Sequence, residues 1–378
     1  MTRIEDIVLE PKSTLSQQAR DILADFAIQI DTHLEKYFDT KLKNPIGFDG
    51  NQRKLYTQIW THIKEHNLRP AKRLRASFMY YGYYLLGGKD MQSILDASMS
   101  IELIHTALLM HDDVMDQDDT RRGSPTTHEY YKNIHTTTYT SGDSTHYGYS
   151  MAINVGDIAL LSGYEILSQS KFDHAIKIDA INRLLQGIVN TGYGQSMDVT
   201  LESIGRASEE EITHLHHAKT AIYTYENPLH IGALLAGGTQ EDFELISEYA
   251  IPGGIAFQLQ DDILGLFGDS EKTGKPDHSD ISQGKITLLY IKALENADQN
   301  QRDIINKLYG KRDITSKEAQ IIREIIRSTQ SVEYSRDISV QYAQQAQKVT
   351  NKMRKRGWNP KAIDYLDGIA QYMIDREV

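Results

Sequence analysis

The chain has 378 residues, and 41 Lys and Arg against 52 Asp and Glu give it a formal net charge of −11. It contains no cysteine, which excludes a disulfide-stapled scaffold, a cysteine-ligated zinc site and a thiolate nucleophile. An acidic chain is also a poor candidate for binding nucleic acid, so an anionic ligand would need local basic residues or metal ions.

Apolar residues recur at helical spacing through most of the chain. Spacings of three and four predict amphipathic helices over 22–38, 95–108 and 255–263, and again near 304–308 and 321–325. The strict alternation typical of half-buried strands is absent. The length is compatible with two or three domains, but no change of composition marks a boundary. We therefore expect an all-α fold, with residues 1–378 forming one large single-domain helical bundle.

The N-terminal segment MTRIEDIVLEPKS is charged and does not resemble a signal peptide. No run of 18 or more apolar residues occurs, so we expect no membrane span and a cytoplasmic protein. Residues 133–148 are rich in Thr, Ser, Gly and His, which favour turns, and we expect a mobile loop there.

A first acidic cluster closes the apolar run of IELIHTALLMHDDVMDQDDTRRG. Asp112 and Asp116 lie a turn apart on one helical face, with Asp113 beside them. Like charges at this spacing destabilise a helix by roughly 0.2–0.5 kcal/mol per pair, and carboxylates sit poorly at a helix C-terminus. A solvated helix end remains the simpler interpretation of one such cluster, whereas a bound divalent cation would relieve both effects.

A second acidic pair, Asp261 and Asp262, follows the apolar run of IAFQLQDDILGLFGD. Two such helices can face one another across a bundle. Ligand sets made only of oxygen suit Mg²⁺, which usually binds one or two carboxylates together with substrate phosphates. Basic residues trail both clusters, and Arg and Lys are the side chains that bind phosphate. The pattern predicts a polyphosphate substrate held by Mg²⁺.

These segments together are similar to a known family. HDDVMDQDDTRRGSPTTH resembles the first aspartate-rich motif of the trans-isoprenyl diphosphate synthases, or polyprenyl synthetases. FQLQDDILGLFGD, followed by KTGKP and GKIT, resembles the second motif. AKRLRA, NVGD, GQSMD and KTAIYTYENPLHIGALLAG continue the match in the family's order, over about residues 60–295.

The resemblance implies an all-α bundle around a central active-site cavity, usually as a homodimer. It implies that isopentenyl diphosphate is joined head-to-tail to an allylic diphosphate, and that the product is an all-trans polyprenyl diphosphate. Asp112 and Asp116 would bind two Mg²⁺ ions and Asp261 a third, while Asp113 and Asp262 would support these ligands.

The resemblance also assigns the two diphosphates to different basic residues. The isopentenyl diphosphate site would be formed by Lys72, Arg75, His105 and Arg122. The allylic diphosphate would contact Arg121, Lys219, Gln258, Lys275 and Lys285. Among these, Arg121, Lys219, Thr220 and Gln258 would act in catalysis, with the oxygens of Thr220 and Gln258 directed toward the allylic cation.

Chain length should depend on the helix below Asp112. A residue five positions earlier lies about 7.5 Å down the helix axis, and in the family a large aromatic there, or four positions earlier, stops growth at short products. Here these positions are Ala107 and Leu108, so we expect a product longer than fifteen carbons, with twenty favoured. The floor could instead come from another helix, through Tyr80, Tyr81 or Tyr193.

The sequence departs from the family pattern at three positions. Ala71 and Ala76 replace a Gly and a Pro around the basic motif, and Gly265 stands where the second acidic motif usually ends in Asp. Since Asp261 is retained, we expect metal binding to survive. The histidines of THLHHAK, His214, His216 and His217, fit a solvated helix face better than a metal site.

Two other functions are compatible with parts of this pattern. A class I terpene cyclase would share the fold and the first acidic motif, but would carry an Asn/Ser/Glu metal motif in place of DDILG and lack the basic isopentenyl site. A regulatory subunit of a heteromeric prenyl synthase should have lost its aspartates, and both clusters are intact here.

Overall fold

Helices form almost all of the structure, a computed structural model that describes residues 14–47, 49–268 and 278–375. They are α1 (Thr14–Lys43), α2 (Gly50–Asn67), α3 (Leu74–Leu85), α4 (Met91–Asp116), α5 (Thr127–Thr138), α6 (Ser144–Gln169), α7 (His174–Ile204), α8 (Glu209–Leu215), the π-helix η1 (His216–Glu226), α9 (Asn227–Leu235), α10 (Gln240–Phe267), α12 (Ser279–Gln283), α13 (Leu288–Asn296), α14 (Gln299–Leu308), α15 (Ser316–Ser328), α16 (Ser331–Lys355) and α17 (Pro360–Asp375). Strands in the described residues are limited to the short pair β1 (Thr120–Arg121) and β2 (Ser124–Pro125). The prediction of an all-α fold is confirmed.

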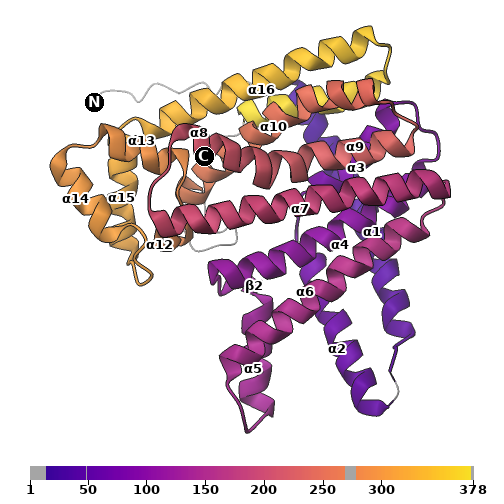
Figure 1. The fold of residues 1–378 in the computed structure, drawn as a ribbon, viewed down its shortest axis with the longest axis horizontal. Helices are drawn as coiled ribbons and strands as arrows, with labels where there is room; N and C mark the ends of the chain where they lie inside the picture. The colour runs from indigo at the N-terminus through magenta and orange to yellow at the C-terminus, as the bar shows by residue number, and fades with distance from the viewer. Residues whose placement is uncertain (1–13, 48, 269–277, 376–378) are drawn as a thin grey trace, which may run out of the picture.

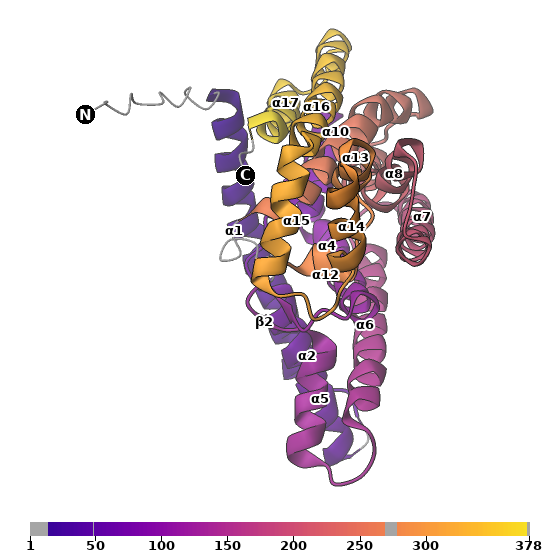
Figure 2. The same cartoon turned by 90° about the vertical axis from the view of Figure 1, so that its left-hand side faces the viewer.

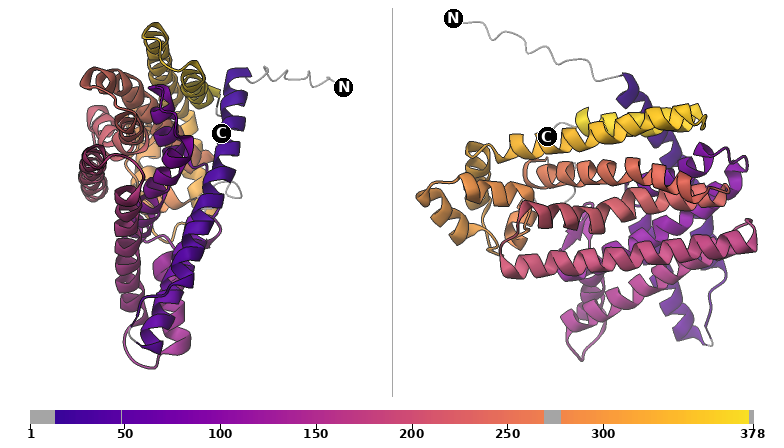
Figure 3. Two further views of the ribbon diagram at one scale, coloured as in Figure 1. Left: turned by 90° about the vertical axis from the view of Figure 1, so that its right-hand side faces the viewer. Right: turned by 45° about the horizontal axis from the view of Figure 1, so that its top comes forward.

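Long helices lie side by side in a layer whose order is α16, α10, η1 with α9, and α7 (Figures 1 and 3). Beneath this layer α3 packs on α9, and α4 packs on both α3 and α6. The C-terminal helix α17 packs between α1 and α16. The predicted helical segments all lie within these elements, because their apolar stripes face neighbouring helices.

Buried apolar side chains of the described residues gather in three clusters. One includes Phe38, Ile63 and Ile104 from α1, α2 and α4. A second centres on Tyr249 of α10 and Tyr365 of α17. The third is formed by α10, α13 and α15. Both acidic motifs therefore sit at the ends of helices that are anchored in core.

Close helix packing depends on glycines at two crossings. A Cβ on Gly232 of α9 would lie 2.0 Å from the carbonyl oxygen of Met79 on α3. On α6, a Cβ on Gly156 would lie 2.3 Å from Nε2 of His111, next to the first acidic motif on α4. Only glycine permits the first approach, because the opposing atom belongs to the backbone. At the second crossing the His111 ring fills the space beside Gly156, next to the end of α4 that carries the aspartates.

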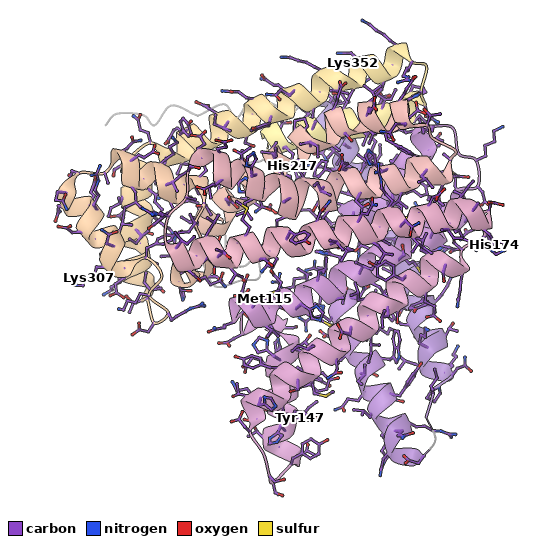
Figure 4. The ribbon with its side chains drawn as sticks, viewed as in Figure 1. Met115, Tyr147, His174, His217, Lys307 and Lys352 are labelled. Carbon is purple, nitrogen blue, oxygen red and sulfur yellow. The ribbon has the colours of Figure 1, made fainter. Side chains whose placement is uncertain are left out.

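The structure confines the non-helical stretch between α5 and α6 to residues 139–143, so the predicted loop over 133–148 was wrong for most of its length. The two helices project from the body beside α2, with Tyr147 near the tip (Figures 2 and 4). Tyr130 of α5 stacks on His62 of α2 with ring centroids 4.2 Å apart. This tertiary contact favours helix in a segment whose composition favours turns.

One helix of the described residues, α4, is long and apolar enough to cross a membrane by length and composition. In the structure 78% of its most apolar window is buried against other helices. The core helix of a water-soluble bundle satisfies the same criterion, so no membrane span is shown.

Candidate active site

The first acidic cluster occupies the C-terminal turn of α4, which ends where Gln117 adopts the left-handed conformation. Asp113 is fully buried and forms an ion pair with Arg121, and its carboxylate lies 4.0 Å from Nε2 of His66. Asp112 is partly exposed and lies 3.5 Å from the Arg121 guanidinium. Asp113 therefore anchors Arg121, while Asp112 remains available to a ligand.

The basic pair Arg121 and Arg122 is presented by the β1–β2 hairpin. Thr120 pairs with Pro125 and Arg121 with Ser124, so Arg122 and Gly123 form a two-residue turn. Both have positive φ, 53° and 74°, as the tightest mirror-type hairpin turns require. This turn sends the neighbouring arginines to different places: Arg121 returns to the acidic cluster, and Arg122 joins a second basic group.

Asp116 is buried at the base of the cluster. Its Oδ1 accepts a hydrogen bond from Lys285 Nζ at 3.0 Å. Burial, together with the neighbouring charge of Asp112, raises the pKa of Asp116 to about 6. The two aspartates thus form a like-charge pair in a poorly solvated place, where a divalent cation would be stabilising.

Lys285 also connects this cluster to α7. Its ammonium lies 3.4 Å from Asp198 and 2.6 Å from Glu202, and Lys219 of η1 forms an ion pair with the same Asp198 carboxylate. Burial opposes the charged form of Lys285, but Asp198, Asp116 and Glu202 outweigh it and raise its pKa. Both predicted lysines are therefore charged and held within a few ångströms of one carboxylate.

The GQSMD segment makes this arrangement possible. A Cβ on Gly194 would lie 2.6 Å from the backbone nitrogen of Lys219, so only glycine lets α7 approach η1 so closely. On the other side of η1, a Cβ built on Gly254 of α10 would lie 2.4 Å from the Cα of Ala221. The π-helix is held between two glycine contacts, with Lys219 and Thr220 directed to the site between them.

Thr220 begins a chain of hydrogen bonds along α10. Its Oγ1 donates to Gln258 Oε1 at 2.6 Å, and Gln258 Nε2 donates to Asp262 Oδ1 at 2.8 Å. The other oxygen of Asp262 lies 3.1 Å from Nε2 of His216, which is 4% exposed. The prediction that His216 belongs to a solvated face was wrong, since it is buried beside the second acidic motif.

A second basic group lies apart from the aspartates. Arg75 donates to Thr224 Oγ1 at 2.8 Å and to Nε2 of His105 at 3.1 Å, and its guanidinium lies over the Tyr223 ring. Burial and the surrounding arginines, Arg75 and Arg122 first among them, lower the pKa of His105 well below its usual value. The neutral ring then carries its proton on Nδ1, a buried atom without a hydrogen-bond partner in the described structure.

Arg122 belongs to the same group, since burial and the charges of Arg73 and Arg121 lower its pKa to about 10. Its guanidinium contacts a backbone carbonyl, that of Arg69, at 3.5 Å. Mutual repulsion between these cations would be relieved by an anion. The geometry thus brings Arg75, His105 and Arg122 together as predicted.

Lys72 is placed differently from its predicted partners. It is exposed, and its Nζ lies 3.3 Å from the Tyr372 hydroxyl on α17. Its neighbour Arg73 is buried and forms ion pairs with Asp31 and Glu102, which makes it a structural residue. Ala76 donates its backbone N–H to Glu102 at 3.2 Å, a bond that the Pro usual in the family could not make.

A cavity of about 120 Å³ brings the acidic and basic groups of α7, η1, α10 and α12 into one space. Its lining includes five of the predicted residues, namely Lys219, Thr220, Gln258, Asp262 and Lys285. The lining residues are Asp198, Leu215, His216, Lys219, Thr220, Gln258, Asp262, Asp280, Lys285, Ile286 and Thr287. Two lysines at a cavity with carboxylates around it can hold a diphosphate together with cations.

The predicted metal ligands fit Mg²⁺ by the chemistry of their donors, all of them carboxylate oxygens. Asp261 is partly exposed on the last turns of α10. Among the described residues, a group of three possible ligands within 4.8 Å of one another occurs elsewhere, at Asp119, His128 and Glu129. Glu129 there is already paired with Lys132 at 2.7 Å, so we assign that group to the local structure. The predicted contact Lys275 lies outside the described residues.

The chain-length positions lie on α4 below the aspartates. Ala107 is fully buried in the core cluster of α4 and α6, whereas Leu108 is partly exposed, one turn before Asp112. Tyr193 is 72% exposed on α7, so within one protomer it cannot form the floor of a cavity. Tyr80 and Tyr81 pack on one another on α3.

Three comparisons bear on what these residues do. The family model described as Polyprenyl synthetase matches residues 57–327. A short chain isoprenyl diphosphate synthase of Methanocaldococcus jannaschii is 32% identical over 307 residues, 81% of this chain and 85% of that protein. A geranylgeranyl diphosphate synthase of Sulfolobus acidocaldarius is 32% identical over 309 residues, 81% of this chain and 87% of that protein.

A solved structure agrees with these relatives. The crystal structure of a geranylgeranyl pyrophosphate synthase from Corynebacterium glutamicum, complexed with isoprenyl diphosphate and magnesium, superposes with a TM-score of 0.81 and 29% identity. The match covers 97% of this chain and 100% of that one.

Proposed function

This chain belongs to the polyprenyl synthetase family, and we propose that it is a trans-prenyltransferase that condenses isopentenyl diphosphate head-to-tail with an allylic diphosphate. One observation carries the proposal: the site holds two kinds of anion-binding group. At the ends of α4 and α10, lysines and Arg121 are interleaved with carboxylates, while Arg75, His105 and Arg122 form a group of their own. Two diphosphates, one bound with metal ions and one by arginines, match this division.

Asp112, Asp116 and Asp261 would hold Mg²⁺ through their carboxylates. Asp113 and Asp262 would support them through their contacts with Arg121 and Gln258. When bound, Mg²⁺ stabilises the negative charge that develops on a departing diphosphate. The raised pKa of Asp116, caused by burial and by Asp112, supports this assignment because a cation would relieve the repulsion. We propose three ions at the site, as in the family pattern.

The protein's own cations would act on the same leaving group. Lys219 and Lys285 at the cavity, and Arg121 at the end of α4, are charged and preorganised by acidic partners, so that they can pair with phosphate oxygens as the allylic carbon–oxygen bond breaks. Thr220 and Gln258, joined by a hydrogen bond, direct oxygens toward the resulting carbocation. The double bond of isopentenyl diphosphate then attacks the cation, and the new carbon chain loses a proton to the departed diphosphate.

We propose a product of twenty carbons or more. Relatives named geranylgeranyl and geranylfarnesyl diphosphate synthases match most of the chain, at 32% and 28% identity. At the positions where a large aromatic would block growth, α4 carries Ala107 and Leu108. Neither side chain reaches as far across a cavity as Phe or Tyr.

We also propose a homodimer built on α6 and α7. Large apolar side chains stand exposed along these two adjacent helices. They are Ile153 (50%), Leu161 (66%), Ile178 (60%), Leu185 (43%), Val189 (55%), Tyr193 (72%) and Ile204 (55%). A second copy of this chain would cover the same patch through a two-fold axis. Light scattering should find a dimer, and Leu161→Asp with Val189→Asp should give monomers, whereas Leu55→Asp on α2 should not.

One assay tests the activity against both alternatives. Purified protein is incubated with Mg²⁺, labelled isopentenyl diphosphate and allylic primers of several lengths, and the products are sized. Linear polyprenyl diphosphates that disappear in excess EDTA are expected. Cyclic hydrocarbon would identify a terpene cyclase, turnover only with an added partner would identify a regulatory subunit, and full turnover in EDTA would contradict the metal-dependent mechanism.

A further inference from the structure

The loop between α14 and α15, residues 309–315, packs on the short helix α12 that precedes Lys285, at one end of the molecule (Figures 1 and 2). Gly310 donates its backbone N–H to the carbonyl oxygen of Ile281 at 2.8 Å. Gly284 ends α12 with a φ of 77°, and a Cβ built on it would lie 3.1 Å from the Cα of Gly310. Two backbones therefore touch immediately before Lys285.

Tyr309 connects this loop to the backbone of Lys285. Its hydroxyl donates a hydrogen bond to the Lys285 carbonyl oxygen at 2.6 Å, and its ring stacks on that of Tyr290 with the centroids 4.4 Å apart. Burial, followed by the neighbouring carboxylate of Asp280, raises the pKa of Tyr309 well above its usual value. The hydroxyl therefore keeps its proton and remains a donor, and it fixes the backbone of the lysine that pairs with Asp116.

Arg312 connects the same loop to the end of α4. Its Nη1 donates to the backbone carbonyl of Asp116 at 3.2 Å, although the two residues lie 196 positions apart. The last carbonyls of a helix have no partner within the helix, and a cation is favoured beside them. Leu308 and Ile314, on either side of the loop, are buried in the third apolar cluster. The loop thus contacts the backbones of both residues of the Lys285–Asp116 ion pair.

We propose that Tyr309 and Arg312 are positioning residues for the transfer reaction, which hold Lys285 and Asp116 in place relative to one another at the allylic diphosphate. The proposal rests on the proposed function, because it depends on what Lys285 and Asp116 do there. Neither positioning residue needs to touch the substrate, since each acts through a backbone carbonyl. A shift of about 1 Å in a catalytic group can cost 10²-fold in rate, so a loosened backbone is enough to impair turnover.

Tyr309→Phe tests the first contact, because it removes one hydroxyl and keeps the ring. Tyr249→Phe is the matched control: the Tyr249 hydroxyl also donates to a backbone carbonyl at 2.6 Å, that of Leu366, but in the core between α10 and α17. Both variants should melt about 2–4 °C below wild type. Only Tyr309→Phe should lower kcat/KM for the allylic diphosphate, by about tenfold or more, while KM for isopentenyl diphosphate stays within about twofold of wild type.

A double variant tests whether Tyr309 acts through Lys285. The ammonium is already absent in Lys285→Gln, so adding Tyr309→Phe should lower kcat/KM for the allylic diphosphate by less than about twofold more. A further loss as large as that of Tyr309→Phe alone would show that the two residues act independently, which would overturn the proposal.

Arg312→Met tests the second contact, because it removes the guanidinium and keeps most of the side-chain length. Arg302→Met is the matched control, since Arg302 is also exposed and donates to backbone carbonyls at the end of a helix, those of Leu294 and Glu295 on α13. Arg312→Met should lower kcat/KM for the allylic diphosphate roughly threefold or more, and Arg302→Met should not.

The outcomes separate the two hypotheses. Active wild-type protein with equal kcat/KM in Tyr309→Phe and Tyr249→Phe overturns the positioning role and leaves the proposed function standing. Absence of linear polyprenyl diphosphates from the wild-type protein overturns the proposed function, and this proposal with it. If Tyr309→Phe does not fold, Arg312→Met decides, and equal kcat/KM in Arg312→Met and its control overturns the proposal.

Discussion

Lys285 and Asp116 form an ion pair, 3.0 Å from Nζ to Oδ1, between residues that lie 169 positions apart in the chain. The pair joins the segment after the second acidic motif to the last turn of α4, which carries the first. Asp198 and Glu202 lie within reach of the same ammonium. Lys285 is thus a charged centre that neutralises carboxylates from two helices.

Replacing Lys285 should impair both catalysis and folding. In Lys285→Gln, kcat should fall roughly 10²–10³-fold, the cost of losing one preorganised group at a developing charge. The melting temperature in EDTA should also fall, since Asp116, Asp198 and Glu202 would face one another without their cation. Lys292→Gln is the control, because Lys292 pairs with Glu209 and Glu295 away from the cavity. Its kcat should stay within about twofold of wild type.

In the absence of metal, the ionised Asp116 carboxylate should lower the stability of the folded protein at neutral pH. Its pKa of about 6, raised by burial and by Asp112, exceeds the 3.8 of a free carboxyl. The folded state therefore holds the proton more tightly, and stability present at low pH is lost as the pH rises through about 6. In EDTA above about pH 7, Asp116→Asn should be more stable than wild type by roughly 1–3 kcal/mol.

The dependence on pH and metal checks this assignment. Thermal unfolding of the two proteins in EDTA should differ less as the pH falls toward about 4. Mg²⁺ should stabilise the wild type more than the variant, because Asp116→Asn removes a proposed ligand. An equal difference in stability at every pH would show that Asp116 does not titrate in this range.

Two neighbouring arginines should have separable effects. Arg73 has a side chain only 2% exposed and pairs with Asp31 and Glu102, so Arg73→Gln should cost about 3–5 kcal/mol of unfolding free energy. Arg75→Gln should instead raise KM for isopentenyl diphosphate about 10–100-fold, with KM for the allylic substrate little changed. Steady-state kinetics and chemical denaturation distinguish them, and an equal rise in both KM values would place Arg75 outside the isopentenyl site.

The length of the product should change with the size of the side chains on α4 below Asp112. Leu108 is partly exposed one turn before Asp112, so Leu108→Tyr should shorten the product without a large loss of stability. Ala107→Tyr should also shorten it, but with a lower melting temperature because Ala107 is fully buried. Met91→Tyr, at the start of α4 and about 25 Å along the helix from the two test positions, is the control. An unchanged product in both test variants would show that the floor lies on another helix.

Helical periodicity was sufficient to predict the fold class, and motif order pointed to candidate site residues that the structure brings together in part. The grouping of Arg75, His105 and Arg122 and the linked Thr220 and Gln258 were confirmed as neighbours. Their roles in catalysis stay predictions.

Long-range pairs could not be read from the sequence in the same way. Asp198 lies in the quoted GQSMD segment, but only folding reveals that it pairs with both Lys219 and Lys285. His216 looks solvent-exposed in a run of polar residues, because its partner Asp262 is far along the chain. The composition of residues 133–148 favours turns, but packing of the helix that begins before them, such as that of Tyr130 on His62, stabilises helix instead.

In the π-helix η1, the positions of the active-site side chains depend on the exact number of residues in the segment. In a π-helix the hydrogen bonds join residues i and i+5, so the segment holds one residue more than an α-helix of the same length. Deleting one residue within His216–Glu226 would favour ordinary α-helical bonding, which keeps the flanking helices in phase but turns side chains inside the segment by up to about 100°. Lys219 and Thr220 would then leave the cavity while the helix itself persisted. Substitutions away from Lys219 and Thr220 can be tolerated here, but insertions and deletions should abolish activity in a protein that still folds.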